Sequence, residues 1–395
     1  MKKIIFLVID GLGEEPVDAF GKKTPLEEAK TPNFNFLAKN GILGCLIPWR
    51  EKNSLPTSED CHLALFGFDP KKFNPGRGVL EALGAKMKIK KGDLCFRANF
   101  ATLDQKGIII DRRAGRIEKT EGLISALRKI KIKGVKIFLK KAFGHRFVLV
   151  LRGKNLSAKV SSNDPKKIGV FPLKILGQKR TVKILNNFLE KAKAILENHP
   201  INKERIKKGE LPANYILLRG AGKLKKIQSF KLKYGKKACV IAGGTLYKGI
   251  GQYLGMKEIK VKGANGMFNT NLKGKFLAAK KALSKFDFIF LHIKAADNLA
   301  EDGNFLGKKE FLEKIDKEIK NLFPLENTIL VITGDHNTSC QLKSHSPGLV
   351  PFLIFDSERK FEGKEKFSEK NCQKGQWGKI LQIKILSKVL KLAKK

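Results

Sequence analysis

The segment Thr328-Ile-Leu-Val-Ile-Thr-Gly-Asp335-His336 decides the fold class, and His345 follows nine residues after it. Four apolar residues and a threonine stop at a glycine, which is typical of a buried parallel strand. A carboxylate and an imidazole come directly after that strand. Because open α/β sheets keep their active sites at the carboxyl ends of their strands, the segment predicts a strand end that carries metal ligands. An Asp-His pair alone would also fit an ordinary turn.

Other strand-like runs lie near both ends of the chain, with helix-like stretches between or after them. We expect strands over Lys3–Ile9, Phe286–Ile293, Thr328–Thr333 and Val350–Phe355. We expect helices from Thr31, as N-cap, to about Asn40, over Lys308–Leu322 and over Gly378–Ala393. This alternation predicts a doubly wound, mostly parallel α/β sheet.

The middle of the chain has strands of its own and is expected to form an inserted domain. Strand-like runs cover Lys136–Leu139, Phe147–Leu151 and Tyr215–Leu218, and a helical stretch lies around Thr181–Asn198. Since the strands of the main sheet come from both ends of the chain, residues 1–90 and 240–395 are predicted to form one discontinuous domain. Residues 91–239 are predicted to form a smaller inserted α/β (α+β) domain.

Composition limits the classes of function. The net charge is +43, but lysine is spread along the whole chain and no nucleic-acid motif occurs, so we do not expect a nucleic-acid partner. The positive field suits a small phosphorylated substrate. The longest apolar runs are strand-sized, so no membrane span is expected. Six scattered cysteines without a CxxC pair indicate a reduced, cytoplasmic protein. A homo-oligomer is compatible with the sequence.

Several polar residues follow predicted strands. Asp10 ends the first strand, and Asp297 and Glu301 lie four residues apart, on one side of the chain if it is helical there. Ser58 is either an ordinary helix N-cap or, beside a metal, a nucleophile. Carboxylates with imidazoles suit manganese, zinc or magnesium. The candidate ligands, enough for two metals, are Asp10, Ser58, Asp297, Glu301, Asp335, His336 and His345.

Arginines in the middle of the chain, several of them beside glycines, are candidate anion-binding residues. A guanidinium binds phosphate or carboxylate at two points, and the alternative interpretation is a set of surface ion pairs. Because this chain otherwise prefers lysine, arginines at these positions favour a specific role. The candidates are Arg77, Arg97, Arg112, Arg113, Arg116, His145, Arg146 and Arg219.

With these segments in view, the chain resembles the archaeal-type 2,3-bisphosphoglycerate-independent phosphoglycerate mutases of the alkaline phosphatase superfamily. The matches run nearly end to end, and so many in order are far more specific than a single motif. They include Val8-Ile-Asp10-Gly-Leu-Gly13, His62-Leu-Ala-Leu-Phe-Gly-Phe-Asp-Pro70, Gly76-Arg-Gly-Val-Leu-Glu-Ala-Leu-Gly84, Asp111-Arg-Arg-Ala-Gly-Arg116, Arg219-Gly-Ala-Gly222, His292-Ile-Lys294 and Thr333-Gly-Asp-His336.

The resemblance implies an alkaline-phosphatase-like fold and interconversion of 3-phosphoglycerate and 2-phosphoglycerate in glycolysis and gluconeogenesis, without 2,3-bisphosphoglycerate. Ser58 is then the nucleophile that carries the phosphoryl group as phosphoserine. Two divalent metals are implied, Mn²⁺ or alternatively Mg²⁺, Co²⁺ or Zn²⁺. One would be held by Asp10, Ser58, Asp335 and His336, and the other by Asp297, Glu301 and His345. The inserted domain would clamp the substrate, Lys294 would also bind it, and closure would exclude water.

The chain departs from the family pattern at several positions. Glu301 stands where the family typically has histidine, and Thr57-Ser58-Glu59 replaces the usual Gly-Ser-Asp. Glutamate can still bind a metal, but its added negative charge would change the metal preference or weaken phosphate binding. A phosphatase or phosphotransferase of the same superfamily, acting on another small phosphorylated acid, therefore stays open as an alternative.

Overall fold

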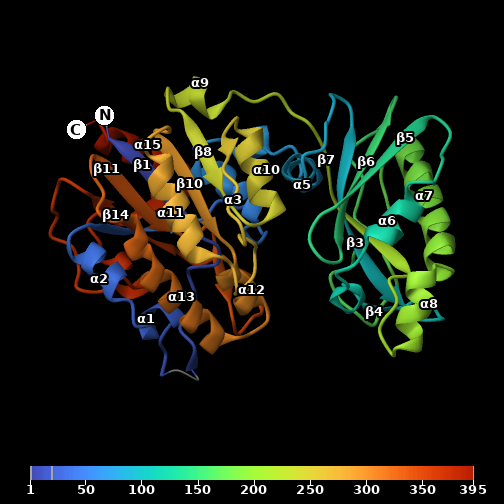
Figure 1. Cartoon of the computed structure of the whole chain (residues 1–395), viewed down its shortest axis with the longest axis horizontal. Helices are drawn as coiled ribbons and strands as arrows, with labels where there is room; N and C mark the ends of the chain where they lie inside the picture. The colour runs from blue at the N-terminus through green and yellow to red at the C-terminus, as the bar shows by residue number, and fades with distance from the viewer. Residues whose placement is uncertain (1, 19–20, 395) are drawn as a thin grey trace. The chain divides into compact units, whose positions relative to one another are not determined.

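The computed structural model describes residues 2–18 and 21–394 (Figure 1). The chain forms two compact units: a first unit of Met1–Asn74 and Ile227–Lys395, and an inserted unit of Pro75–Lys226. The inserted unit begins and ends earlier than the predicted range of residues 91–239. The reason is that α5 (Arg77–Gly84) packs against strands of the inserted unit, whereas β8 (Ala238–Ile241) pairs with a strand of the first unit.

The first unit is built on one sheet with the strand order β15-β2-β14-β11-β1-β10-β8-β9. The central strand β1 (Lys3–Ile9) pairs in parallel with both of its neighbours, β10 (Phe288–Ile293) and β11 (Thr328–Thr333). The other strands are β2 (Ile42–Ile47), β9 (Lys257–Glu258), β14 (Val350–Asp356) and β15 (Lys379–Leu381). Because β1, β10 and β11 run in the same direction, their carboxyl ends meet at one edge of the sheet.

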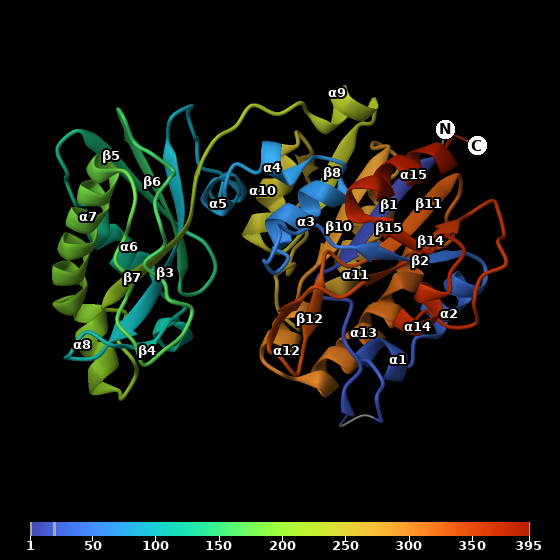
Figure 2. The same cartoon turned by 180° about the vertical axis from the view of Figure 1, so that it is seen from behind.

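Helices cover both faces of this sheet. Figure 1 shows α11 (Leu272–Ala282) and α13 (Phe305–Ile319) in front of it, and Figure 2 shows α3 (Ser58–Leu65) on the opposite face. Leu7 of β1 belongs to the core cluster that includes residues of α11 and α13, whereas the ring of Phe6 contacts Phe66 at the end of α3. Burial on both faces explains why the strand is an unbroken apolar run.

Shorter elements complete the first unit. The helical segments are α1 (Pro25–Glu28), α2 (Pro32–Lys39), α4 (Pro70–Phe73), α9 (Phe230–Tyr234), α10 (Thr245–Tyr253), α12 (Ala295–Glu301), η3 (Lys320–Leu322), α14 (Glu369–Gln373), η4 (Gln382–Lys384) and α15 (Ile385–Leu392). A hairpin of β12 (Asn337–Ser339) and β13 (Ser344–Ser346) follows β11. Within residues 2–18 and 21–394, no helix is both long and apolar enough to cross a bilayer.

The predicted fold class, a doubly wound and mostly parallel sheet with an inserted unit, is confirmed. The predicted strands Lys3–Ile9 and Thr328–Thr333 agree with β1 and β11 residue for residue. The prediction of one helix over Gly378–Ala393 is wrong in its first part. There β15 adds to the sheet edge as a parallel partner of β2, and only residues 385–392 form an α-helix. The predicted strand near residue 350 is β14, which runs antiparallel to β11.

The inserted unit is an antiparallel sheet with helices, so it is of the α+β type. Its strands are β3 (Leu94–Leu103), β4 (Ile109–Asp111), β5 (Val135–Lys141), β6 (Arg146–Gly153) and β7 (Tyr215–Lys223). Its helical segments besides α5 are η2 (Ala114–Arg116), α6 (Glu121–Leu127), α7 (Lys179–Glu197) and α8 (Pro200–Lys207). Leu185 and Phe188 of α7 pack in one core with Phe100 of β3 and Phe147 of β6.

Candidate two-metal site and arginine cluster

The parallel strands of the first unit bring three carboxylates to one edge of the sheet. Asp10 follows β1, Asp335 follows β11 after one glycine, and Asp297 lies in the first turn of α12, shortly after β10. Each of the three residues is at most 1% exposed. Burying carboxylates together is costly unless cations compensate their charge, so this edge of the sheet is a candidate metal site.

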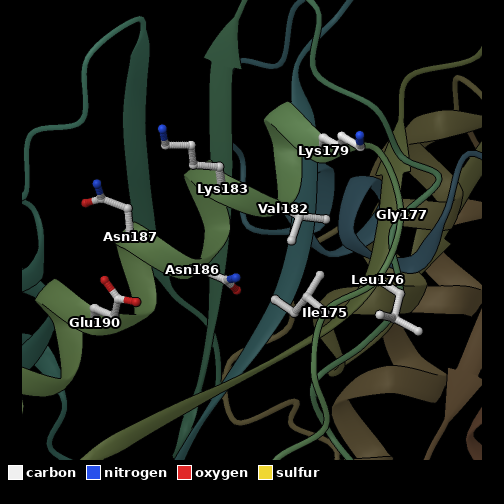
Figure 3. Close-up of a pocket in the computed structure, with 9 residues that line it drawn as sticks. All are labelled: Ile175, Leu176, Gly177, Lys179, Val182, Lys183, Asn186, Asn187 and Glu190. Atoms are coloured by element: carbon white, nitrogen blue, oxygen red, sulfur yellow. The ribbon is translucent and has the colours of Figure 1, made fainter.

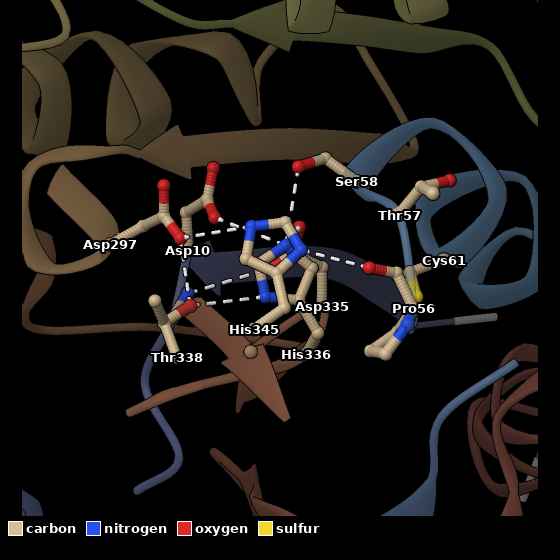
Figure 4. A network of polar contacts seen from close by, with 12 residues as sticks. Asp10, Pro56, Thr57, Ser58, Cys61, Asp297, Asp335, His336, Thr338 and His345 are labelled. Atoms are coloured by element: carbon tan, nitrogen blue, oxygen red, sulfur yellow. Dashed lines mark hydrogen bonds and ion pairs between the residues drawn. The ribbon is translucent and has the colours of Figure 1, made fainter. Parts of the chain in front are cut away.

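The first candidate group contains Asp10, Asp335 and His336, whose ligand atoms lie within 4.8 Å of one another. His336 Nε2 is 3.7 Å from Asp10 Oδ1 and 3.2 Å from Asp335 Oδ2. The hydroxyl of Ser58 lies 3.2 Å from the same Nε2 (Figure 4). Two carboxylates, an imidazole and a hydroxyl therefore converge, and these are the four residues that the family resemblance implies for the first metal.

Ser58 is held by the start of α3. Thr57 is the N-cap, because its hydroxyl oxygen accepts from the backbone N–H of Asp60 at 3.4 Å. The N-cap interpretation of Ser58 is therefore wrong, and Ser58 is the first residue of the helix, 2% exposed. The N-terminal turn of a helix favours negative charge, which suits a serine oxygen that has lost its proton.

The second candidate group contains Asp297, His336 and His345. His345 lies in β13, opposite Thr338 of β12, so the hairpin returns it toward His336, and the two imidazole rings stack at 3.7 Å. His345 donates from Nδ1 to the carbonyl of Pro56 (2.8 Å), which leaves Nε2 as the free nitrogen 3.5 Å from Asp297 Oδ1. This is the usual way in which a protein orients a histidine that binds a metal.

Glu301 lies at the margin of the second group. It is the last residue of α12, four residues after Asp297, so the predicted helical spacing is present. Its Oε1 is 4.0 Å from His345 Nε2, and its side chain is 41% exposed. The atoms that gather within 4.8 Å come from Asp297, His336 and His345 instead. Glu301 is therefore near the second group without belonging to its compact part.

The donor set fits divalent cations. Asp10 Oδ1 and Asp335 Oδ2 are buried and have no hydrogen-bond partner in the described part of the chain. Burial, followed by the charges of Asp10 and Asp297, raises the pKa of Asp335 well above its usual range. Burial also lowers the pKa of His336 to about 3, so this imidazole is neutral, the form that binds metals. Unsatisfied oxygens beside a neutral imidazole are what a cation would complete.

Lys294, predicted to bind substrate, lies within the carboxylate cluster. Its ammonium is 3.1 Å from Asp10 Oδ2 and also pairs with Asp297 Oδ2. Burial opposes the charge of the lysine, but Asp10 and Asp297 outweigh burial and raise its pKa well above the usual value. Lys294 is thus one cation that offsets the three carboxylates.

Three buried residues around this cluster were not among the predicted site residues. The hydroxyl of Tyr247 donates to Asp10 Oδ2, and the ring of Tyr247 stacks on His292 at 3.4 Å. His62 donates from Nδ1 to the carbonyl of Ser58 at 2.7 Å. The sequence pattern could have identified the two histidines as site residues, because His292 interrupts an apolar strand and His62 follows Ser58 by one helical turn. Tyr247 lies on α10, which carries none of the predicted site residues, so no sequence pattern marks it as part of the site.

In the inserted unit, predicted arginines gather on one face of the sheet. Arg97 of β3 is directly opposite Arg219 of β7, and Arg146 of β6 is opposite Asn99, two residues along β3 on the same face. Burial, followed by the charges of Arg146, Arg77 and Arg219, lowers the pKa of Arg97 well below its usual value. Positive groups packed this closely make a candidate site for an anion.

The other predicted anion-binding residues differ in their contacts and in how far they are buried. Arg112 makes a two-point contact with Asp164 (2.9 Å and 2.9 Å), and Arg219 Nε also lies 3.2 Å from that carboxylate. His145 is 8% exposed, and burial together with the charges of Arg146, Arg97, Arg113 and Arg219 lowers its pKa to about 2. Arg116 is exposed at the end of η2. Asp164, which orients two of the arginines, was missed because a lone Asp-Pro gives no spacing signal.

A cavity of about 600 Å³ in the inserted unit contains none of the predicted site residues (Figure 3). It lies between α7 and the segment 175–177, and is lined by Ile175, Leu176, Gly177, Lys179, Val182, Lys183, Asn186, Asn187 and Glu190. The candidate chemistry is thus found in the carboxylate and arginine clusters, and not in this cavity.

A doubly wound sheet that gathers carboxylates and imidazoles at the ends of its central strands is typical of a metal-dependent enzyme. Residues 38–202 match the family described as 2,3-bisphosphoglycerate-independent phosphoglycerate mutase. A protein from Archaeoglobus fulgidus, named 2,3-bisphosphoglycerate-independent phosphoglycerate mutase 1, is 43% identical over 98% of this chain and 97% of its own length. The chain belongs to this family of mutases.

Two solved structures are similar over the whole chain. One, from Pyrococcus horikoshii, is 32% identical with a TM-score of 0.86 and covers 100% of this chain and 97% of its own. The other is a cofactor-independent phosphoglycerate mutase from Thermoplasma acidophilum, 34% identical with a TM-score of 0.67, and the match covers 100% of both chains. The resemblance seen in the sequence motifs is therefore confirmed.

Proposed function

We propose that this chain interconverts 3-phosphoglycerate and 2-phosphoglycerate through a phosphoserine formed on Ser58. The observation that carries the proposal is the position of the Ser58 hydroxyl, 3.2 Å from His336 Nε2 in the first turn of α3. A serine oxygen at a helix N-terminus, beside a cluster suited to a cation, is a favourable nucleophile. Membership of the mutase family supports the choice of substrate.

Two divalent cations would be bound, with Mn²⁺ as the expected metal. Asp10, Ser58, Asp335 and His336 would hold one of them, and Asp297, Glu301 and His345 the other. When bound, the metals would lower the pKa of the serine hydroxyl and neutralise charge on the phosphoryl oxygens. The neutral imidazole of His336 and the unsatisfied carboxylate oxygens of Asp10 and Asp335 support this assignment.

The reaction needs only exchange of one phosphoryl group. Ser58 Oγ would lose its proton and form a bond to phosphorus while the bond from phosphorus to the substrate oxygen breaks. The departing oxygen would take up one proton and become a hydroxyl, so no proton is gained or lost overall. After the glycerate has reoriented, its other hydroxyl would attack the phosphoserine and release Ser58. The group that leaves and the group that returns are the same, so 2,3-bisphosphoglycerate is not required.

The arginine cluster of the inserted unit would bind the substrate. Phosphoglycerate carries a phosphate and a carboxylate, and two-point contacts from guanidinium groups suit both. The assigned residues are Arg77, Arg97, Arg112, Arg113, His145, Arg146 and Arg219, with Lys294 in the first unit. Arg116, which is exposed, would add only long-range attraction for the anion. Arg97 supports this role most directly, because its Nε is buried without a hydrogen-bond partner among the described residues.

We further propose that the enzyme works in the cytoplasm, in glycolysis and gluconeogenesis. All six cysteines of the described chain are buried free thiols, which suits a reducing compartment. Both substrate and product are small intermediates that a cytoplasmic enzyme would meet.

The test is to incubate purified protein with Mn²⁺ and 3-phosphoglycerate and to follow the phosphorus NMR spectrum. We expect 2-phosphoglycerate to form without added bisphosphoglycerate, and no activity once a chelator has removed the metal. Net release of inorganic phosphate would instead assign the chain to the phosphatases or phosphotransferases of the superfamily. Absence of any turnover with Mn²⁺, Mg²⁺, Co²⁺ or Zn²⁺ would contradict the proposal.

A further inference from the structure

The two oxygens of Asp10 have different surroundings. Oδ2 accepts the hydroxyl of Tyr247 and lies 3.1 Å from Lys294 Nζ and 3.4 Å from His292 Nε2. Oδ1 has no hydrogen-bond partner among residues 2–18 and 21–394, and it lies 3.7 Å from His336 Nε2. One oxygen is therefore engaged by Tyr247 and Lys294, while the other faces the remaining groups of the first candidate metal site.

Tyr247 is rigidly held where it meets Asp10. It is 2% exposed, on α10, and its ring stacks on that of His292 at 3.4 Å with an interplanar angle of 18°. His292 is itself fully buried in β10, the strand next to the one that ends at Asp10. The stacked pair thus fixes the hydroxyl of Tyr247 against one oxygen of the carboxylate.

We propose that Tyr247, supported by the stacked His292, is a positioning residue that engages Asp10 Oδ2 and so makes Asp10 a one-oxygen ligand through Oδ1. The inference rests on the proposed metal site. A carboxylate free to turn could give both oxygens to one cation. Holding Oδ2 would prevent this and would leave room beside the metal for the Ser58 oxygen or the substrate. Partners of this outer layer typically change metal affinity by about 10- to 100-fold when they are lost.

The experiment uses Tyr247→Phe, which keeps the ring and removes the hydroxyl. The matched control is Tyr253→Phe on the same helix, since Tyr253 is 7% exposed and its hydroxyl donates to the carbonyl of Phe73 at 2.8 Å. Titration calorimetry of the metal-free protein with Mn²⁺ measures both affinities, and the visible spectrum of the Co²⁺-loaded protein reports the coordination number. Thermal unfolding shows whether each variant is folded.

We expect Tyr247→Phe to weaken Mn²⁺ binding at one of two sites by about tenfold or more, and to change the cobalt spectrum. Excess Mn²⁺ should restore most of the turnover, since lost metal affinity is offset by concentration. Tyr253→Phe should match the wild type in affinity and spectrum. A Tyr247→Phe protein with wild-type Mn²⁺ affinities and cobalt spectrum would overturn the inference, as would equal weakening of both sites.

A second variant keeps the test decisive if Tyr247→Phe does not fold. His292→Phe keeps an aromatic ring against Tyr247 and removes Nε2, and the same selective loss at one Mn²⁺ site is expected. If this variant binds both Mn²⁺ ions as the wild type does, the supporting role of His292 is wrong. A wild-type protein that binds no Mn²⁺ would instead contradict the proposed function itself, so the two failures are distinguishable.

Discussion

The two units gather opposite charges by different means. In the first unit, Asp10, Asp297 and Asp335 are buried together at strand ends, with Lys294 as an internal cation. In the inserted unit, arginines such as Arg97 and Arg219 face each other across an antiparallel sheet. Parallel strands bring together loops that are distant in sequence, whereas an antiparallel pair sets two side chains side by side.

This difference in arrangement indicates which kind of ligand each charged cluster can bind. Negative groups at loop ends can surround a small cation from several sides, which suits a metal. Guanidinium groups on a flat sheet face offer paired donors, which suit the oxygens of a phosphate or carboxylate. Each cluster carries charge that the described protein groups only partly offset. The following substitutions separate the chemistry of the first cluster from the binding role of the second.

The largest effect is expected for Ser58→Ala. Loss of the nucleophile should lower kcat by at least about a thousandfold, while the fold is kept. Transfer of the phosphoryl group is measured with 3-phosphoglycerate, and folding by circular dichroism. Ser54→Ala is the control, because the hydroxyl of Ser54 only donates to the carbonyl of Glu51 at 3.0 Å. If Ser58→Ala kept a tenth of the activity or more, the covalent route would be wrong.

A smaller loss is expected for Arg219→Lys. Lysine keeps the charge but loses the planar two-point contact, so kcat/KM for 3-phosphoglycerate should fall by roughly 10- to 100-fold. Mn²⁺ binding, measured by calorimetry, should not change, because the carboxylate cluster lies in the other unit. Arg152→Lys is the control, since Arg152 pairs with Asp93 at 2.7 Å and is not one of the predicted anion-binding residues. Equal losses in Mn²⁺ affinity and kcat/KM would show that the clusters are not separate.

A still smaller, qualitative change is expected for Glu301→His. Activity should be preserved or improved, and the second site should shift toward Zn²⁺ and Co²⁺ relative to Mg²⁺, because imidazole favours the softer metals. Metal preference is measured by competition between the ions, with Glu301→Gln as the control that keeps the shape of the side chain. Should rate, metal content and preference all stay unchanged in both variants, Glu301 is not part of the second site.

The smallest effect is expected for Arg116→Ala. Arg116 is exposed at the end of η2, whereas Arg97 and His145 are buried. We therefore expect kcat/KM for 3-phosphoglycerate to change by less than about threefold, as for an exposed charge in water. Steady-state kinetics at constant ionic strength checks this. A loss as large as that of Arg219→Lys would mean that Arg116 meets the substrate directly.

Much of the candidate metal site could be predicted, because buried strands are recognisable in the sequence as apolar runs. Asp10, Asp335 and His336 follow unbroken apolar runs, and parallel strands must end at a common edge. Two of the residues that were missed, Tyr247 and Asp164, lack such a pattern. Tyr247 lies on a helix distant in sequence from Asp10, the residue that its hydroxyl contacts. Asp164 lies in an irregular segment of the inserted unit, and only the fold brings it between Arg112 and Arg219.

The sequence by itself determined the family, the doubly wound sheet and the residue types that would meet at its edge, because alternation of apolar runs and polar strand ends is a local property. Only the tertiary structure decided which polar atoms of the candidate site have a hydrogen-bond partner and which residues lie at its margin. It gives Asp10 Oδ2 to Tyr247 and leaves Oδ1 open, and it sets Glu301 at the margin of the second group. Hydrogen-bond partners and exposure depend on segments far apart in the chain, so no local pattern could supply them.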